Sequence, residues 1–318
     1  MTPRRAPLVA AAPVKRPGMG MLSATAAVLV WGASSVLIKQ VDGVNGLGVA
    51  CYRIWLGAAV GSIAFVASGG RVTRRLLRLS LVGGLSFGLD IVLFFCAVKE
   101  TSIANATVIG ALQPVLVLLV AGRVFSEQPR AAEIGWGAVA IGGAALVVLG
   151  GDGGGANSLY GDLLAVGALV AWTGYFVFTK TARKDLTAFE YLTGMAIVAA
   201  IAVVPIPLLF AGTLTAPDAD GWLTIVYITL INGLLGHFLM SWAHGHVTLL
   251  ALSLLTLAIP VFSAAAAALW IDEPLALLQV GGMAVVLVAL GLVSLSATRR
   301  SPEVVRADVD AIEVAPHP

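Results

Sequence analysis

Charged residues and cysteines are both scarce in this chain of 318 residues. Only 11% of the residues are charged, whereas 59% are hydrophobic, and the mean hydropathy is +0.96. A soluble domain carries roughly 25% charged residues, which help to cover its surface. The shortage of charge therefore excludes a soluble enzyme, a nucleic-acid binder and a charged interaction tail as the main function. It predicts that lipid surrounds most of the chain.

The elements of a metal or cofactor site are also missing. Cys51 and Cys96 lie in apolar runs, where two thiols behave as small hydrophobes rather than as a disulfide framework. The glycine-rich stretch 150–155 lacks the Lys-Ser/Thr that completes a phosphate-binding loop. His244 and His246 form only a weak metal-binding pattern, because no further ligand lies beside them. We therefore predict no cofactor.

What the chain does have is ten apolar runs of about 20 residues, the length that crosses a bilayer as a helix. The runs are 20–39, 47–68, 79–98, 102–122, 132–149, 160–180, 188–211, 222–243, 248–270 and 276–297. Turn residues and charges separate them, where polar backbone can be solvated. The pattern predicts an all-α integral membrane protein with ten transmembrane helices.

The basic residues test this count independently, because cytoplasmic connections of membrane proteins are enriched in Lys and Arg. If both termini are cytoplasmic, sixteen of the nineteen Lys and Arg residues fall in cytoplasmic segments, among them 71–78 and 180–185. Only Lys39 and Lys99 fall outside, and Arg53 lies within a span. One missed or extra helix would place basic residues on both sides of the membrane. We therefore expect cytoplasmic N- and C-termini.

The sequence also repeats itself at a shift of 146 residues. The matching residues include Pro114 and Pro260, Glu127 and Glu273, Gly135 and Gly281, and, at a shift of 141, Trp31 and Trp172. Five-helix repeats at 19–149 and 160–297 follow, joined by a linker at 150–159 and flanked by tails at 1–18 and 298–318. An odd number of helices inverts the second repeat in the bilayer. Inverted repeats are typical of secondary transporters.

Several segments resemble one family. They are Val30-Trp31-Gly32-Ala33-Ser34-Ser35, Gly161-Asp162-Leu163-Leu164-Ala165 with Trp172, and, in each half, a proline-containing helix, an acidic turn with proline and a Gly-rich fifth helix. Together they resemble the EamA-type transporters of the drug/metabolite transporter superfamily over residues 20–297. The resemblance implies a ten-helix carrier, commonly an exporter of amino acids or related small metabolites in the bacterial inner membrane. Relatives often carry Glu before the proline of the ninth helix, where this chain has Ile259. A proton-coupling role at that position is therefore not implied.

Two opposite charges lie deep in the predicted spans. Arg53 and Asp90 each lie roughly 10–12 Å from the outer end of their helices, at 1.5 Å per residue. Charges inside a membrane are costly, and an ion pair between these two would relieve both penalties. The sequence leaves open whether such a pair is structural or senses substrate or protons in a cavity. His237 matches Ile91, the neighbour of Asp90, and is either a proton-coupling residue or a hydrogen-bonded structural histidine.

The two repeated prolines give further cavity candidates. Pro114 and Pro260 interrupt their helices and should free the carbonyls of Gly110 and Thr256, which suits either a watery cavity or a packing kink. Other candidate ligands are polar or aromatic side chains, whose alternative role is packing or interface anchoring. They are Asn105, Gln113, Asn232, Thr256, Trp31, Trp172, Tyr175 and Trp242.

These patterns predict a secondary, ATP-independent transporter that exports amino acids or related small metabolites by alternating access. A channel-like permease and, less favoured, an integral-membrane enzyme are the alternatives. The expected partners are the bilayer, a small-molecule substrate and either protons or a counter-substrate. The small-residue pairs Gly57/Gly61 and Gly84/Gly88 indicate close helix packing within the chain, and a homodimer is left open. Glu127 and Glu273 are interpreted as capping or solvated turn residues.

Overall fold

The computed structural model describes residues 16–32, 37–38, 41–101, 103–125, 127, 129–150, 158–210, 212, 214–270 and 275–293. Every regular element in this part of the chain is helical. Eight helices are long and apolar enough to cross a membrane, and the two shorter apolar helices are Pro17–Gly32 and Leu277–Val293. The all-helical membrane architecture is confirmed, whereas ten complete spans remain a prediction.

The elements follow the predicted runs in order. The first half contains α1 (Pro17–Gly32), α3 (Gly46–Ala67), α4 (Arg74–Glu100), α5 (Ile103–Gly110), α6 (Gln113–Phe125) and α7 (Ala131–Leu149). The second half contains α8 (Leu159–Ala182), α9 (Ala188–Ala202), α10 (Ile206–Leu209), α11 (Ala219–Tyr227), the π-helix η1 (Ile228–Gly236), α12 (His237–His244), α13 (Leu249–Leu255), the 3₁₀ turn η2 (Thr256–Ala258), α14 (Ile259–Trp270) and the helix Leu277–Val293.

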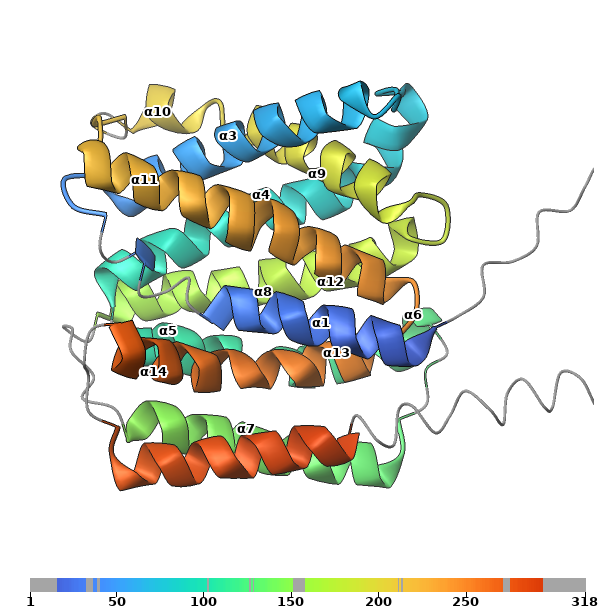
Figure 1. The fold of residues 1–318 in the computed structure, drawn as a ribbon, viewed down its shortest axis with the longest axis vertical. Coiled ribbons are helices and arrows are strands. Elements are labelled where there is room, and N and C mark those ends of the chain that lie inside the picture. Colours follow the sequence, from blue (N-terminus) through green and yellow to red (C-terminus); the bar gives the residue numbers. More distant parts are fainter. Residues whose placement is uncertain are drawn as a thin grey trace, which may run out of the picture.

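The helices lie side by side along one direction, and their connections gather at two ends of the bundle (Figure 1). One end holds the connections at 68–73, 183–187 and 245–248. We call it the basic end, because it carries ten of the twelve Lys and Arg residues that the structure describes. The remaining two are Arg53 and Lys99, so the charge segregation expected from the sequence is preserved in the fold.

Helix α4 is central, and it packs along both α8 and α9 of the second half. Two glycines permit the close approach of α4 to α9. A Cβ atom built on Gly84 would lie 2.7 Å from Cβ of Val198, and one on Gly88 would lie 3.3 Å from Cβ of Ala199. The small-residue spacing at 84 and 88 therefore serves packing between the two halves of one chain.

Capping residues set the helix boundaries, and one of them explains a difference from the predicted runs. The predicted run 79–98 is the helix Arg74–Glu100, which starts five residues earlier because the Thr73 hydroxyl accepts a hydrogen bond from the Leu76 amide at 3.1 Å. The added turn carries Arg74, Arg75 and Arg78 out of the apolar zone. Hydropathy alone therefore underestimates the length of this helix.

Candidate functional site

A cavity of about 120 Å³ lies between the two halves of the chain. Its lining comes from α1, α3, α4 and α5 of the first half and from α8, η1, α12, η2 and α14 of the second. Eight of the candidate residues from the sequence line it, namely Trp31, Arg53, Asp90, Trp172, Asn232, His237, Thr256 and Pro260. Phe94, Phe95 and Thr107 also line it and were not singled out by the sequence.

The two charged residues share the cavity without a direct ion pair. Arg53 is 6% exposed and Asp90 is 9% exposed. In the part of the chain that the structure describes, ion pairs join Arg75 to Asp185 and Lys180 to Glu127, and none joins Arg53 to Asp90. The direct pair expected from their equal depth is therefore not formed, because equal depth does not fix the rotation of each helix about its axis.

Arg53 instead contacts a histidine and two aromatic rings. Its Nη2 atom lies 3.4 Å from Nε2 of His237. The guanidinium carbon lies 5.3 Å from the ring centre of Phe95 and 5.9 Å from that of Phe87, both cation–π distances. Asp90 lines the same cavity, and its carboxylate accepts no hydrogen bond within the described residues.

The contacts of His237 define its tautomer. A guanidinium can only donate, so Nε2 of His237 accepts from Arg53 and carries no proton. The proton then sits on Nδ1, which donates to the Tyr175 hydroxyl oxygen at 3.1 Å. Tyr175 is fully buried on α8, and it contacts His237 without lining the cavity. His237 is thus hydrogen-bonded on both nitrogens and still faces the cavity.

The π-helix η1 shapes one wall of the cavity. Trp31 donates from Nε1 to the Asn232 carbonyl at 3.0 Å, and the Asn232 side chain donates to the Val30 carbonyl. A Cβ atom on Gly236 would lie 2.5 Å from Nε1 of Trp31, so only glycine admits the indole there. The sequence contains only one signal for this π-helix, namely Asn232 beside Gly233 within an apolar run. Such segments are frequent at functional sites.

The two proline breaks meet beside the cavity. The chain turns at Ala111–Leu112 before α6, and forms η2 before α14. The Thr256 hydroxyl in one break donates to Oε1 of Gln113 in the other at 3.3 Å. Both interruptions predicted from the prolines are therefore present. Of the two prolines, only Pro260 lines the cavity, whereas Pro114 is buried and does not.

Three details differ from the sequence interpretation. The Thr256 carbonyl is not free, because it accepts a hydrogen bond from the Ile259 amide within η2. Trp242 does not line the cavity, because its ring stacks on His246 at 4.0 Å. The side chain of Asn105 lies outside the described residues. The prolines therefore predicted where the helices are interrupted. They did not predict that the Thr256 carbonyl would find a partner in the 3₁₀ turn.

Comparisons with known proteins agree with this two-part arrangement. Both halves match the same family model, described as the EamA-like transporter family, at residues 18–149 and 159–295. No curated protein matches the chain. A solved structure titled "Crystal structure of protein" is similar over 90% of this chain and 100% of its own, with a TM-score of 0.75 and 21% identity. That likeness concerns the fold alone.

Proposed function

Because this chain belongs to the EamA-like transporter family, we propose that it is a secondary carrier that exports amino acids or related small metabolites by alternating access. Membership makes it a multi-pass membrane protein that transports small solutes. The observation that supports the finer proposal is one cavity, lined by both halves, that holds two separated opposite charges. A solute with an amino and a carboxyl group complements this arrangement.

In the proposed complex, the solute carboxylate binds the Arg53 guanidinium and its ammonium group binds Asp90. Charge-assisted hydrogen bonds of this kind are the strong ones, and a guanidinium can hold a carboxylate through two of them. Trp31 and Trp172 supply apolar surface for the remainder of the solute. Asp90 is available for this role because no described group donates a hydrogen bond to it.

Alternating access requires that the two halves move against each other around the site. The lining fits this requirement, because elements of both halves meet at the two proline breaks. On α4, the lining residues 90–95 lie nearer the end at Glu100 than the basic end at Arg74. If the basic end is cytoplasmic, this conformation holds the cavity nearer the exterior.

His237 offers a way to couple protons to this movement. A proton on Nε2 would remove the acceptor that holds Arg53 and would place two cations side by side. Arg53 would then turn toward Asp90 or a bound carboxylate. The groups that face His237 are Arg53 on α3, Tyr175 on α8, and, across the cavity, Asp90 on α4.

Purified protein in vesicles tests the proposal. We expect internal unlabelled amino acid to accelerate uptake of the labelled compound, and a pH gradient to change the steady-state level. Accelerated exchange identifies a carrier, whereas a flux without acceleration would favour a channel. Single-cysteine labelling in a Cys51→Ser, Cys96→Ser background fixes the orientation. Reaction of a cysteine at position 75 with an impermeant reagent from outside would overturn the assignment of the basic end to the cytoplasm.

A further inference from the structure

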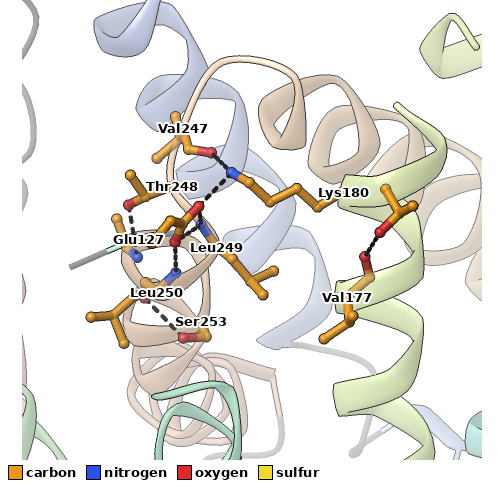
Figure 2. A network of polar contacts seen from close by, with 10 residues as sticks. Glu127, Val177, Lys180, Val247, Thr248, Leu249, Leu250 and Ser253 are labelled. Carbon is orange, nitrogen blue, oxygen red and sulfur yellow. Dashed lines mark hydrogen bonds and ion pairs between the residues drawn. The ribbon is translucent and has the colours of Figure 1, made fainter. Parts of the chain in front are cut away.

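One carboxylate at the basic end, that of Glu127, joins the two halves of the chain. Glu127 follows α6, and Figure 2 shows its side chain directed at the start of α13 and at α8. Its oxygens accept hydrogen bonds from the Leu249 amide at 2.9 and 3.0 Å and from the Leu250 amide at 3.4 Å. The same carboxylate lies 2.9 Å from Nζ of Lys180. Glu127 therefore contacts two separate helices.

These contacts satisfy groups that would otherwise lack partners. The first amides of a helix have no acceptor within the helix, and the positive end of the helix dipole favours a carboxylate there. Thr248, the residue that caps α13 from its own segment, reaches only the Ala251 amide, at 3.3 Å. Glu127 takes the Leu249 and Leu250 amides, so this capping role comes from the other half of the chain.

Lys180 completes the connection. Its Nζ also donates to the Val247 carbonyl at 2.7 Å, just before α13 (Figure 2). The side chains of Lys180 and Glu127 are 16% and 12% exposed. An ion pair this sheltered is screened less than a surface pair, yet water can still reach both partners when the helices separate. The contact is therefore strong when closed and can be released.

The position of this group relative to the cavity suggests what it does. Lys180 lies eight residues beyond Trp172 on α8, a distance of about 12 Å along the helix. Leu249 precedes Thr256 by seven residues, or about 10 Å. The cavity therefore lies toward the middle of the bundle, and the Glu127 contacts lie between it and the surface of the basic end.

We propose that Glu127 is a latch between the two halves, which holds the basic end closed while the cavity is accessible from the opposite end. This proposal rests on the proposed alternating access. Opening the basic end would pull the end of α6 away from α8 and α13, and would break the ion pair and both capping hydrogen bonds together. Three contacts on one carboxylate make this a two-state element rather than a gradual one.

Accessibility of a cavity cysteine tests the latch without any transport assay. The reporter is Ala168→Cys on α8, which lines the cavity, in the Cys51→Ser, Cys96→Ser background. Impermeant maleimide is applied to oriented vesicles from either side, and the ratio of the two labelling rates is measured. The result depends on conformation alone, so a chain that fails to transport the compounds tried still gives an answer.

The variants separate the two functions of the carboxylate. Glu127→Ala removes the ion pair and the caps. Lys180→Met removes the ion pair and the hydrogen bond to the Val247 carbonyl but keeps the caps, and Glu127→Gln keeps an acceptor without the charge. We expect Glu127→Ala to raise labelling from the basic end about tenfold relative to the opposite end, and the other two to raise it about threefold. If Glu127→Ala does not fold, as judged by size-exclusion chromatography, the other two variants carry the test.

Arg75→Gln is the matched control. Arg75 pairs with Asp185 at 3.4 Å at the same end, but the two side chains are 67% and 54% exposed and cap no helix of the other half. We expect no change in the labelling ratio. Unchanged ratios in every folded Glu127 and Lys180 variant would overturn the latch, as would an equal increase in Arg75→Gln, because any lost charge would then have the same effect.

Discussion

The acidic residue at the basic end and the one in the cavity differ in their polar contacts. Glu127 at the basic end accepts two backbone amides and pairs with Lys180. Asp90 in the cavity makes neither a hydrogen bond nor an ion pair with any residue that the structure describes. The chain itself satisfies the first carboxylate, whereas the second has no such partner among the described residues. Under the proposed function, the first carboxylate holds the two halves together and the second binds the solute.

Neutralising Asp90 should have the largest effect on transport and little effect on stability. We expect Asp90→Asn to lower the exchange of a zwitterionic solute by about 10- to 100-fold, since a hydrogen bond to a charged group is worth about 1.5–3 kcal/mol. Thermal stability should change little, because the carboxylate has no hydrogen bond to lose. Exchange rates and melting temperatures of the purified variant measure both.

A double change provides the control for Asp90. Arg53→Leu with Asp90→Leu removes both buried charges together, and a structural pair tolerates such a replacement. We expect a folded protein without exchange. Normal gradient-driven flux in this variant would remove both residues from the mechanism and leave proton coupling, if there is any, to His237.

Tyr175→Phe should have the next largest effect. It removes the hydroxyl that accepts from Nδ1 of His237 at 3.1 Å and leaves a buried donor without a partner, which costs about 1–3 kcal/mol of stability. We expect exchange to fall about tenfold and its dependence on pH to shift, because His237 loses its fixed tautomer. A fall in stability with an unchanged pH profile would identify Tyr175 as a packing residue only.

Replacing the two prolines should reduce transport to different extents. Pro260→Ala alters a residue that lines the cavity, whereas Pro114→Ala alters a buried residue that does not line it. We expect about a tenfold loss of exchange from the first and about a threefold loss from the second. Both variants should express normally, since each proline lies in the first turn of its helix, where alanine is also tolerated. Normal transport by both variants would reduce the prolines to packing residues.

Arg75→Gln should have the smallest effect. An ion pair between exposed side chains contributes about 1 kcal/mol or less, so neither stability nor exchange should change measurably. Chemical denaturation and the exchange assay check this expectation. A loss as large as that of Lys180→Met would mean that charge at the basic end matters regardless of burial.

Hydropathy and turn residues predicted most of the fold, since the runs 132–149 and 160–180 differ little from α7 and α8. The prolines also located both helix breaks. The partners of buried polar groups were harder to predict, because they depend on helix rotation and on contacts far apart in sequence. Arg53 contacts His237 rather than Asp90 across 184 positions.

The contacts of Glu127 were also not predictable from the residues next to it in the sequence. The sequence places it in a turn beside a proline and suggests a cap or a solvated residue. A capping residue usually lies next to its own helix, yet Glu127 caps a helix 122 positions away. No local pattern carries that information, because it depends on how the first half packs against the second.

The most direct test of the account compares three internal compounds in the exchange assay. One is a transported amino acid, one its decarboxylated amine, and one the corresponding acid without the amino group. If Arg53 and Asp90 hold opposite ends of one solute, only the compound with both charges should accelerate labelled uptake strongly, and Asp90→Asn should abolish its advantage over the acid. Equal acceleration by all three compounds would contradict the account.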